Sequence, residues 1–421
     1  MEKVCCILFV LFAISSCETK QNHLKKKFGV ENENAIVQSL EEIEILGTPM
    51  SIKVPEINPD FNYGCKLDDV FDTVYIVHLE TNEDCIVGDI SSMDILNDTI
   101  YILDNKTKSV LSFDINGRFL NKYGKEGNGP GEYIEPTSLT VSENYVYVYD
   151  QWQTKVVKYN HNGVVLSDSK VPFFMQKVIP IYNGDILCYG SQSDNFHLPS
   201  IMDYTIWQCD SSYSTITKIG IHSKRDETIP LGEMNFRFID NHYYYYNFRL
   251  SNYYEILPDG RLTNMLHFVF DSGLYTDDFF VDENTYNTLS EENHLFRIKW
   301  VAQVGQVVVY QLSSHARPTC YVFHNIQDNK TLFNNYTIMD NSELSRILFM
   351  SNFKTVYKGR LVYSLPQERL LSVNKVLMDE HPDLWAGAPD HVREFDKKLL
   401  ESLHEEDNDI LVFAKIKEHF D

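Results

Sequence analysis

Short apolar runs separated by polar turn residues recur along most of the chain. Residues 95–122 contain an apolar run, a polar turn, a second run, an Asn-Gly pair and a third run, and residues 141–168 repeat this order at an offset of 46 residues. Runs of this length bounded by turn residues predict β-strands. The two stretches share the following residues at equivalent positions: Tyr101 and Tyr147, Asp104 and Asp150, Val110 and Val156, Asn116-Gly117 and Asn162-Gly163, and Leu120 and Leu166.

Each Asn-Gly pair predicts a tight turn. Asn116-Gly117 lies between the predicted strands 110–114 and 118–123, and Asn162-Gly163 has the same place in the second unit. Both central residues of a type I′ turn need positive φ, which Asn and Gly adopt more readily than other residues. We therefore predict a hairpin with a type I′ turn at each pair.

Fainter copies of this unit follow downstream. Their predicted strand pairs are 184–189 with 204–209, 243–247 with 253–257, 306–311 with 319–324 and 346–350 with 361–365, and residues 67–88 form an incomplete unit that completes the last one. Periods of about 40–50 residues built from four short strands are typical of β-propeller blades. We predict an all-β, six-bladed β-propeller, with seven blades as the alternative count.

The last part of the chain has a different pattern. After Pro389, apolar residues recur at helical spacing, at Val392, Phe395, Leu399, Leu400 and Leu403. This predicts a short C-terminal helix, followed by a closing strand over residues 410–416. We expect that strand to pair with residues 43–54 and to cover the open edges of the sheets.

The first residues have the pattern of an export signal. One cation, Lys3, precedes the uncharged and mostly apolar residues 4–14. A transmembrane helix needs about 20 apolar residues, so this run is too short for one. The ending Ile14-Ser15-Ser16-Cys17 resembles the lipobox of bacterial lipoproteins, which implies cleavage before Cys17 and acylation of its thiol, for example with palmitate. An ordinary cleaved signal is the alternative.

The segment after Cys17 is polar and basic. Residues 18–27 contain four lysines and little apolar material, which predicts a solvated tether. The predicted domains are thus a signal peptide over 1–16, a tether over 17–40 and the propeller with its C-terminal helix over 41–421. Acidic runs after the lipid-bearing cysteine resemble surface-export signals, and only Glu18 is acidic here. We expect an outer-membrane lipoprotein that faces the periplasm rather than the cell surface.

The most specific resemblance covers residues 113–133. Phe113-Asp114-Ile115-Asn116-Gly117 followed by 123–133, with Gly127-Asn128-Gly129-Pro130-Gly131, resembles the NHL-type repeat and the six-bladed β-propeller lipoproteins common in Bacteroidota. Residues 67–81 resemble that family's opening strand. Residues 407–412 resemble its closing segment, with Asp409 at a position where Pro is expected. The resemblance implies a propeller at the cell envelope and no settled activity.

Composition narrows the classes of partner. The formal charge of −23, from 37 Lys and Arg against 60 Asp and Glu, repels phosphate backbones and excludes nucleic acid as a partner. The 25 Phe, 26 Tyr and 4 Trp favour strands. Five cysteines follow Cys17, and the nearest pairs in sequence are Cys65 with Cys85 and Cys188 with Cys209. An oxidising periplasm permits a disulfide, while small buried core residues are the plainer interpretation.

No local motif predicts catalysis. The loop of Gly127, Gly129, Pro130 and Gly131 lacks the Lys-Ser/Thr ending of a phosphate loop, so we interpret it as a sharp crossing between strands. Asp104 and Asp150 recur at strand ends, where a carboxylate accepts turn N–H bonds. The 14 histidines form no zinc motif, and no cysteine or serine has nucleophile spacing. We therefore predict no catalytic, cofactor-binding or metal-binding residues.

Two sets of residues keep a functional alternative open. The predicted inner strands carry Asp94, Arg237 and Asp240, which lack a recurring His or carboxylate pattern. Trp152 and the tyrosines of 243–246 could stack on sugars or peptides, although strand aromatics more often pack between blades. We expect a monomeric, lipid-anchored binding or scaffold module for a protein, glycan or small molecule. The alternative is a hydrolase or lyase with a metal-assisted site in the central funnel.

Overall fold

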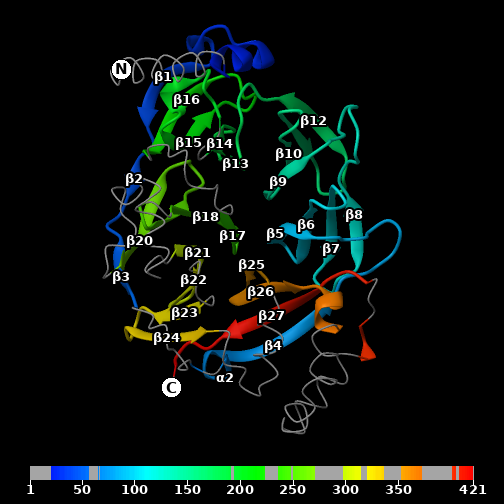
Figure 1. Cartoon of the computed structure of the whole chain (residues 1–421), viewed down its shortest axis with the longest axis vertical. Coiled ribbons are helices and arrows are strands. Elements are labelled where there is room, and N and C mark those ends of the chain that lie inside the picture. Colours follow the sequence, from blue (N-terminus) through cyan, green and yellow to red (C-terminus); the bar gives the residue numbers. More distant parts are fainter. Residues whose placement is uncertain are drawn as a thin grey trace, which may run out of the picture. The chain divides into compact units, whose positions relative to one another are not determined.

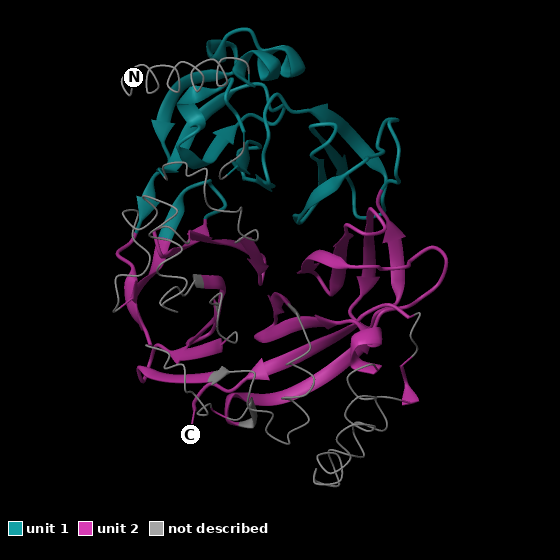
Figure 2. Cartoon of the chain, viewed as in Figure 1, with its two compact units in different colours: residues 1–46, 124–231, 257–263 teal, residues 47–123, 232–256, 264–421 magenta. Residues whose placement is uncertain are grey.

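Most strands of this protein form groups of four antiparallel strands, the arrangement that makes propeller blades. The computed structural model describes residues 20–55, 65, 67–190, 194–222, 236–247, 250–270, 297–313, 320–335, 352–371, 401–403 and 407–420. These residues fall into two units, coloured separately in Figure 2. Unit 1 comprises residues 1–46, 124–231 and 257–263, and unit 2 comprises residues 47–123, 232–256 and 264–421. The fold is all-β and propeller-like.

Unit 1 contains two sheets (Figure 1). The first has the order β12-β11-β10-β9, and the second has the order β1-β16-β15-β14-β13. The strands of the first are β9 (Pro136–Val141), β10 (Val146–Asp150), β11 (Lys155–Tyr159) and β12 (Val165–Lys170). Those of the second are β13 (Lys177–Pro180), β14 (Ile186–Tyr189), β15 (Tyr204–Cys209), β16 (Ile216–His222) and β1 (Val37–Glu42).

Burial falls across the first sheet from the middle to the last strand. Every residue of β10 is buried, while β12 is almost entirely exposed. The buried strand carries the apolar and aromatic residues that the 46-residue repeat places at equivalent positions. Tyr147, Tyr149 and Val156 pack with Phe173, which precedes β13, and with Trp207 and other residues of the second sheet in one core. Part of the aromatic excess in the composition is therefore used for packing between these two sheets.

The N-terminal segment differs from the predicted tether. Residues 20–28 are helical, Glu33–Ala35 form the 3-10 helix η1, and β1 pairs in parallel with β16. Leu24 is 7% exposed and Ile36 is 6% exposed. The prediction of a solvated tether over 17–40 is thus wrong for residues 20–40, because these few apolar side chains are buried against unit 1 while the lysines stay at the surface.

Unit 2 contains two further four-stranded sheets. One has the order β5-β6-β7-β8 and the other β21-β22-β23-β24. Their strands are β5 (Ile90–Leu96), β6 (Thr99–Asp104), β7 (Ser109–Asp114), β8 (Phe119–Lys122), β21 (Arg297–Val304), β22 (Val307–Ser313), β23 (Cys320–Asn325) and β24 (Lys330–Asn335).

A ten-stranded sheet supplies the rest of unit 2, and its residues 45–46 and 262–263 belong to unit 1. It consists of one antiparallel group, β20-β19-β18-β17, and a second, β25-β26-β27-β4, joined by the single parallel pair Ile239 and Val356. The strands are β17 (Phe236–Ile239), β18 (His242–Asn247), β19 (Asn252–Ile256), β20 (Leu262–Phe270), β25 (Asn352–Tyr357), β26 (Arg360–Leu365), β27 (Ile410–Ile416) and β4 (Phe71–His78). β2 (Ile45–Leu46) and β3 (Met50–Val54) pair with β20.

The closing strand forms where the sequence predicts it, with a different partner. β27 spans Ile410–Ile416 and pairs with β26 and β4. The predicted pairing with residues 43–54 is wrong, because β2 and β3 from that segment pair with β20. The strand that pairs with β27 is β4, which comes from the predicted incomplete unit at 67–88. As predicted, that unit supplies the fourth strand of the last group, β25-β26-β27-β4. The helix α2 (Leu67–Val70) immediately precedes β4.

The Asn-Gly turns also differ from the prediction. The hairpins β7–β8 and β11–β12 form, but only the glycines have positive φ, +84° at Gly117 and +78° at Gly163. Gly117 N donates to Asp114 O at 2.9 Å, and Asp114 Oδ1 accepts the backbone N–H of Asn116 and Arg118. This is a type I turn followed by a left-handed glycine, which the Asp114 side chain stabilises.

The predicted strand 346–350 and most of the predicted C-terminal helix, residues 392–400, lie outside the described residues. Leu403, the last apolar position of that pattern, is described and is 6% exposed. The other short helices of the described chain are η2 (Pro199–Ile201) and a turn of helix over residues 367–371.

Candidate functional site

Asp150 organises the loops at one end of the first sheet of unit 1. It ends β10, is fully buried, and accepts the backbone N–H groups of Ile134 at 2.6 Å, Glu135 at 3.4 Å and Gln153 at 3.0 Å. Gln151 N also donates to Glu135 O at 3.2 Å. The loop entering β9 and the turn leaving β10 are therefore tied together by one carboxylate.

Asp104 has the same role in unit 2. It is fully buried at the end of β6, and its carboxylate accepts the backbone N–H groups of Gly88, Asp89, Lys106 and Thr107 and the Thr107 hydroxyl. Both aspartates are committed to backbone donors of their own sheets. Both aspartates therefore have a structural role, as the sequence predicts.

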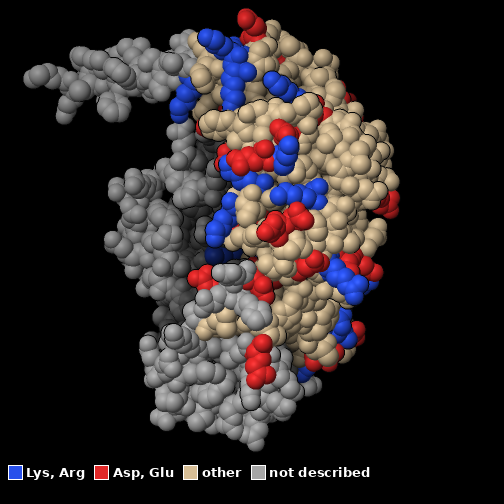
Figure 3. Space-filling model, turned by 90° about the vertical axis from the view of Figure 1, so that its right-hand side faces the viewer, with Lys and Arg blue, Asp and Glu red and all other residues tan. Residues whose placement is uncertain are grey.

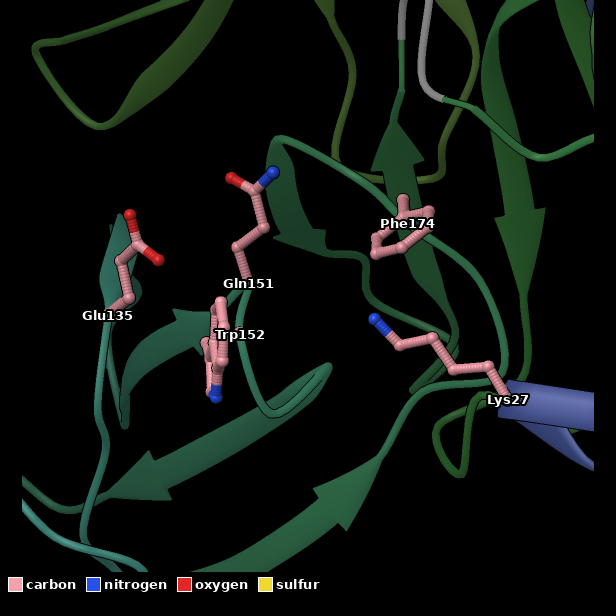
Figure 4. A pocket seen from close by; sticks show the side chains of 5 residues that line it. All are labelled: Lys27, Glu135, Gln151, Trp152 and Phe174. Atoms are coloured by element: carbon pink, nitrogen blue, oxygen red, sulfur yellow. The ribbon is translucent and has the colours of Figure 1, made fainter. Parts of the chain in front are cut away.

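The tied loops of unit 1 present three side chains to a cavity of about 390 Å³. Glu135, Gln151 and Trp152 line one side, and Phe174 and Lys27 line the other (Figure 4). Trp152 is 68% exposed, whereas Trp207 and Trp300 are 1% and 4% exposed. An indole left in water at a cavity is unusual, because an aromatic of this size normally contributes its area to a core.

The second side of the cavity is built on the N-terminal helix. Phe28 contacts Phe174 edge-on at 5.1 Å between ring centroids, and it stacks on His197 at 4.7 Å. Lys27 Nζ lies 4.5 Å from the Phe174 ring centroid. Asn195 fixes the Phe174 backbone, since its side chain accepts from Phe174 N at 2.8 Å and donates to Phe174 O at 2.9 Å. Phe174 is therefore held from both its ring and its backbone.

His197 is neutral in this wall. Burial lowers the pKa of His197, because a charged imidazole loses its hydration there, and the hydrogen bond to Pro172 O opposes this effect. The ring nitrogen Nε2 lies 2.8 Å from that carbonyl and donates to it. A neutral ring can stack on Phe28 without a desolvated charge.

The glycine-rich loop near this cavity has its donors occupied. Gly127 N donates to Tyr133 O, Gly129 N to Glu132 Oε2 at 2.8 Å, and Gly131 N to Asp168 Oδ2 at 2.9 Å. Gly131 has φ +75°, and an added Cβ would overlap Val165. Pro130 has no backbone N–H to offer. The loop connects β8 to β9 and aims no set of N–H groups at an anion.

The residues of the predicted inner strands have separate surroundings. Asp94 on β5 is 3% exposed. Arg237 on β17 donates to Phe236 O and lies over the Phe353 ring at 5.6 Å. Asp240, in the β17–β18 turn, accepts Lys358 N at 3.0 Å. Across the described ranges, no group of three or more His, Cys, Asp or Glu is placed to hold a metal ion.

The tyrosines at 243–246 and Trp152 have different environments. Tyr243, Tyr245 and Tyr246 are at most 9% exposed and contact Phe238, Phe236 and Phe268 respectively. They pack inside unit 2, while Trp152 faces water. Sequence reasoning singled out Trp152 and missed Lys27, Glu135, Gln151 and Phe174. Lys27 was placed in a tether, and no local pattern links it to a loop more than 100 residues away.

One carboxyl of unit 2 has a strongly shifted pKa. Burial raises the pKa of Asp409 to about 6, the nearby Lys354 ammonium opposes the rise, and the carboxylates of Asp89 and Asp104 add to it. Asp409 precedes β27 and hydrogen-bonds to Ser364. It is the residue at which the sequence departs from the expected proline.

The cysteines of the described residues form no disulfide with one another. Cys188 and Cys209 lie on the adjacent strands β14 and β15 with their sulfurs 3.5 Å apart, and both are buried. They are diagonal neighbours in the sheet, since Cys188 is opposite Trp207 and Cys209 is opposite Ile186. The Cys85 thiol donates to Glu80 O at 3.1 Å. Cys17 lies outside the described residues.

The surface charge is mixed on the face shown in Figure 3. Lys and Arg side chains are interspersed with Asp and Glu there. Among the described residues of this face, the acidic side chains thus form no uniform patch. Within the described ranges, no helix is long and apolar enough to cross a membrane.

A family model matches most of the chain. The family described as "Domain of unknown function (DUF4934)" matches residues 52–415. The chain belongs to this family. No curated protein matches the DUF4934 chain in sequence.

Solved structures resemble the DUF4934 chain in fold. A Bacteroides fragilis protein whose name describes it as exported has a TM-score of 0.67 at 19% identity, over 88% of this chain and 100% of its own. A member of the DUF4221 family from Bacteroides vulgatus has a TM-score of 0.45 at 11% identity, over 83% of this chain and 97% of its own. Virginiamycin B lyase from Staphylococcus aureus has a TM-score of 0.34 at 11% identity, over 69% and 81%. The first of these likenesses shows a shared fold.

Proposed function

We propose that this DUF4934 protein is a lipid-anchored module of the cell envelope that binds a ligand in the cavity beside Trp152. The observation that carries this proposal is the exposure of the Trp152 indole, 68%, on a cavity with polar side chains around it. Binding sites combine an apolar surface with a few positioned polar groups. Loops that a buried carboxylate already holds in place supply these groups, so that little conformational entropy is lost when a ligand binds.

The support for a built site comes from how its side chains are held. Asp150 ties the Glu135 loop to the Gln151 turn, and Asn195 fixes the Phe174 backbone. Lys27, Glu135, Gln151 and Trp152 remain exposed in this arrangement, and Phe174 is half-buried. Buried polar groups that hold exposed side chains in place are typical of recognition loops on a rigid scaffold.

The experiment is a ligand-observed saturation-transfer screen with a chemically diverse fragment library. We expect a subset of fragments to receive saturation from the wild-type protein and to lose it with Trp152→Ala. Tyr182→Ala is the matched control, because Tyr182 is an 86% exposed aromatic of unit 1 that does not line the cavity. If every fragment binds both variants equally, the cavity is not the binding site and the proposal fails.

The proposed anchor is the acylated thiol of Cys17. Its support is the apolar run over 4–14 that ends at Ser15-Ser16-Cys17, together with the fold shared with a protein described as exported. Wild-type protein should incorporate labelled palmitate and sediment with the outer membrane. Cys17→Ala should lose both properties, and retained palmitate in that variant would refute the anchor.

The proposed architecture is a six-bladed propeller. Its support is the strand pairing of the described residues: three sheets are four-stranded, the β13–β16 sheet has four strands plus β1, and the ten-stranded sheet divides into two groups of four. A crystal structure should contain six blades in one ring. Seven blades, or two units without a common ring, would overturn this proposal.

A further inference from the structure

The ligand class can be narrowed by the donors and acceptors around the cavity, on the premise that the cavity binds a ligand as proposed above. Lys27 offers only donors, Glu135 offers only acceptors, and Gln151 offers both. A ligand that satisfies all three must itself both donate and accept hydrogen bonds at several points. Hydroxyl groups do this, because each has one donor and two acceptor lone pairs.

The aromatic side chains of the cavity indicate a second property of the ligand. Trp152 presents an exposed indole, and Phe174 lies on the opposite side of the cavity (Figure 4). A flat ring with apolar C–H groups on its faces can lie against an indole and displace the water there. The ligand therefore combines an apolar face with a polar edge.

Other ligand classes fit less well. Polyphosphates meet one cation, Lys27, and the carboxylate of Glu135 repels them. A quaternary ammonium is attracted to aromatic faces, but the Lys27 ammonium lies 4.5 Å from the Phe174 ring and already occupies that position. Alkyl chains would leave the carboxylate and the ammonium without hydrogen-bond partners.

We propose that the cavity binds a neutral saccharide, with one sugar ring stacked on Trp152 and its hydroxyl groups bonded to Glu135, Gln151 and Lys27. The opposite charges of Lys27 and Glu135 balance, which matches an uncharged ligand. The volume of about 390 Å³ suits a ring-sized ligand, so the site recognises one unit of a chain whose remainder lies outside the cavity.

The test is isothermal titration of the purified full chain carrying Cys17→Ala with neutral gluco-, manno- and xylo-oligosaccharides. We expect one series to bind the parent protein. Trp152→Ala should weaken that binding by about tenfold or more, and Gln151→Ala should weaken it by about threefold to tenfold. The control Tyr182→Ala should bind as the parent does.

The outcomes separate this inference from the proposal on which it rests. If no oligosaccharide binds, while fragments from the library bind at Trp152, the saccharide assignment is overturned and the binding site stands. If oligosaccharides bind equally to Trp152→Ala and Tyr182→Ala, the stacking assignment is overturned. If neither sugars nor fragments bind at Trp152, both proposals fail.

Discussion

Asp150 and Trp152 are close neighbours in the chain with opposite environments. Asp150 is fully buried and accepts three backbone N–H groups, while Trp152 exposes two thirds of its surface. The buried carboxylate fixes the turn, and the fixed turn keeps the indole out of the core. At the residue scale, therefore, the polar residue supplies structure and the aromatic residue supplies the candidate binding surface.

Asp409 makes the stability of unit 2 depend on pH. Its folded-state pKa of about 6 is above the ordinary value of 3.8, so folding favours the protonated carboxyl. The resulting contribution to stability is present below about pH 4 and is lost as the pH rises to about 6. At pH 7 the ionised carboxylate of Asp409 therefore lowers the stability of unit 2.

Asp409→Asn should remove this destabilisation, because the amide carries no charge. We expect the variant to be more stable than wild type by about 2 kcal/mol at pH 7, with the difference shrinking toward zero below pH 4. Urea unfolding at several pH values measures this. Asp84→Asn, at an exposed aspartate of the same unit, should change stability by less than about 0.5 kcal/mol throughout. A constant difference between Asp409→Asn and wild type would contradict the assignment.

At the scale of the elements, strand positions were predictable from the sequence and turn geometry was less so. The strands at 186–189, 204–209, 252–256 and 410–416 follow the apolar runs. The Asn-Gly turns were misassigned because the side chains of Asp114 and Asn160, which accept the turn N–H groups, decide the turn type. Within the described residues, the two-residue turns with positive φ at both central residues are Asn97-Asp98, Asp240-Asn241 and Lys358-Gly359.

Gly117 tests this turn geometry. It has φ +84°, and an added Cβ would overlap the carbonyl oxygen of His78 in β4. Gly117→Ala should therefore combine a backbone cost of about 1 kcal/mol with a steric cost of about 1–3 kcal/mol. Gly359→Ala carries only the first cost, because Gly359 has φ +70° and no atom lies within 4 Å of its added Cβ.

Chemical denaturation of both glycine variants gives the comparison. Gly117→Ala should unfold at a clearly lower urea concentration than Gly359→Ala, with an unchanged dependence on denaturant. Equal losses for the two variants would show that β4 does not pack against the β7–β8 turn as described.

At the scale of the whole chain, segments far apart in sequence meet around Asn408. This residue is 1% exposed; its side chain accepts Val87 N at 2.7 Å and donates to Glu80 O at 2.7 Å and Cys85 O at 2.8 Å. Residues near the start of unit 2 are thereby joined to the start of its last strand. The resemblance of 407–412 to a closing segment located this region, but the hydrogen-bond partners of Asn408 could not be predicted without the strand pairing.

Asn408→Ala should destabilise unit 2 by about 2–3 kcal/mol, because it leaves the buried N–H of Val87 and the buried carbonyl of Cys85 without this partner, while Glu80 O keeps the Cys85 thiol. Asn82→Ala, at an exposed asparagine of the same segment, should cost less than about 1 kcal/mol. Thermal unfolding followed by calorimetry measures both. A small effect of Asn408→Ala would mean that the closing segment contributes little to the stability of the unit.

The candidate site was predictable only in part, because contacts between residues far apart in the sequence build it. Trp152 could be named as an aromatic in a turn, but its exposure depends on the hydrogen bonds of Asp150. Lys27 and Phe174 reach the cavity through the packing of the N-terminal helix on Phe174 and His197. A segment with four lysines and few apolar residues gives no sign of such packing.

The most direct test of the account is fluorine NMR of protein in which the four tryptophans carry 5-fluorotryptophan. Trp152→Phe assigns the Trp152 resonance, and a neutral oligosaccharide is then titrated into the wild-type protein. We predict that the Trp152 resonance shifts in a saturable way, while those of the buried Trp207 and Trp300 stay in place. An unchanged Trp152 resonance under conditions in which the oligosaccharide binds would contradict the claim that this cavity is the binding site.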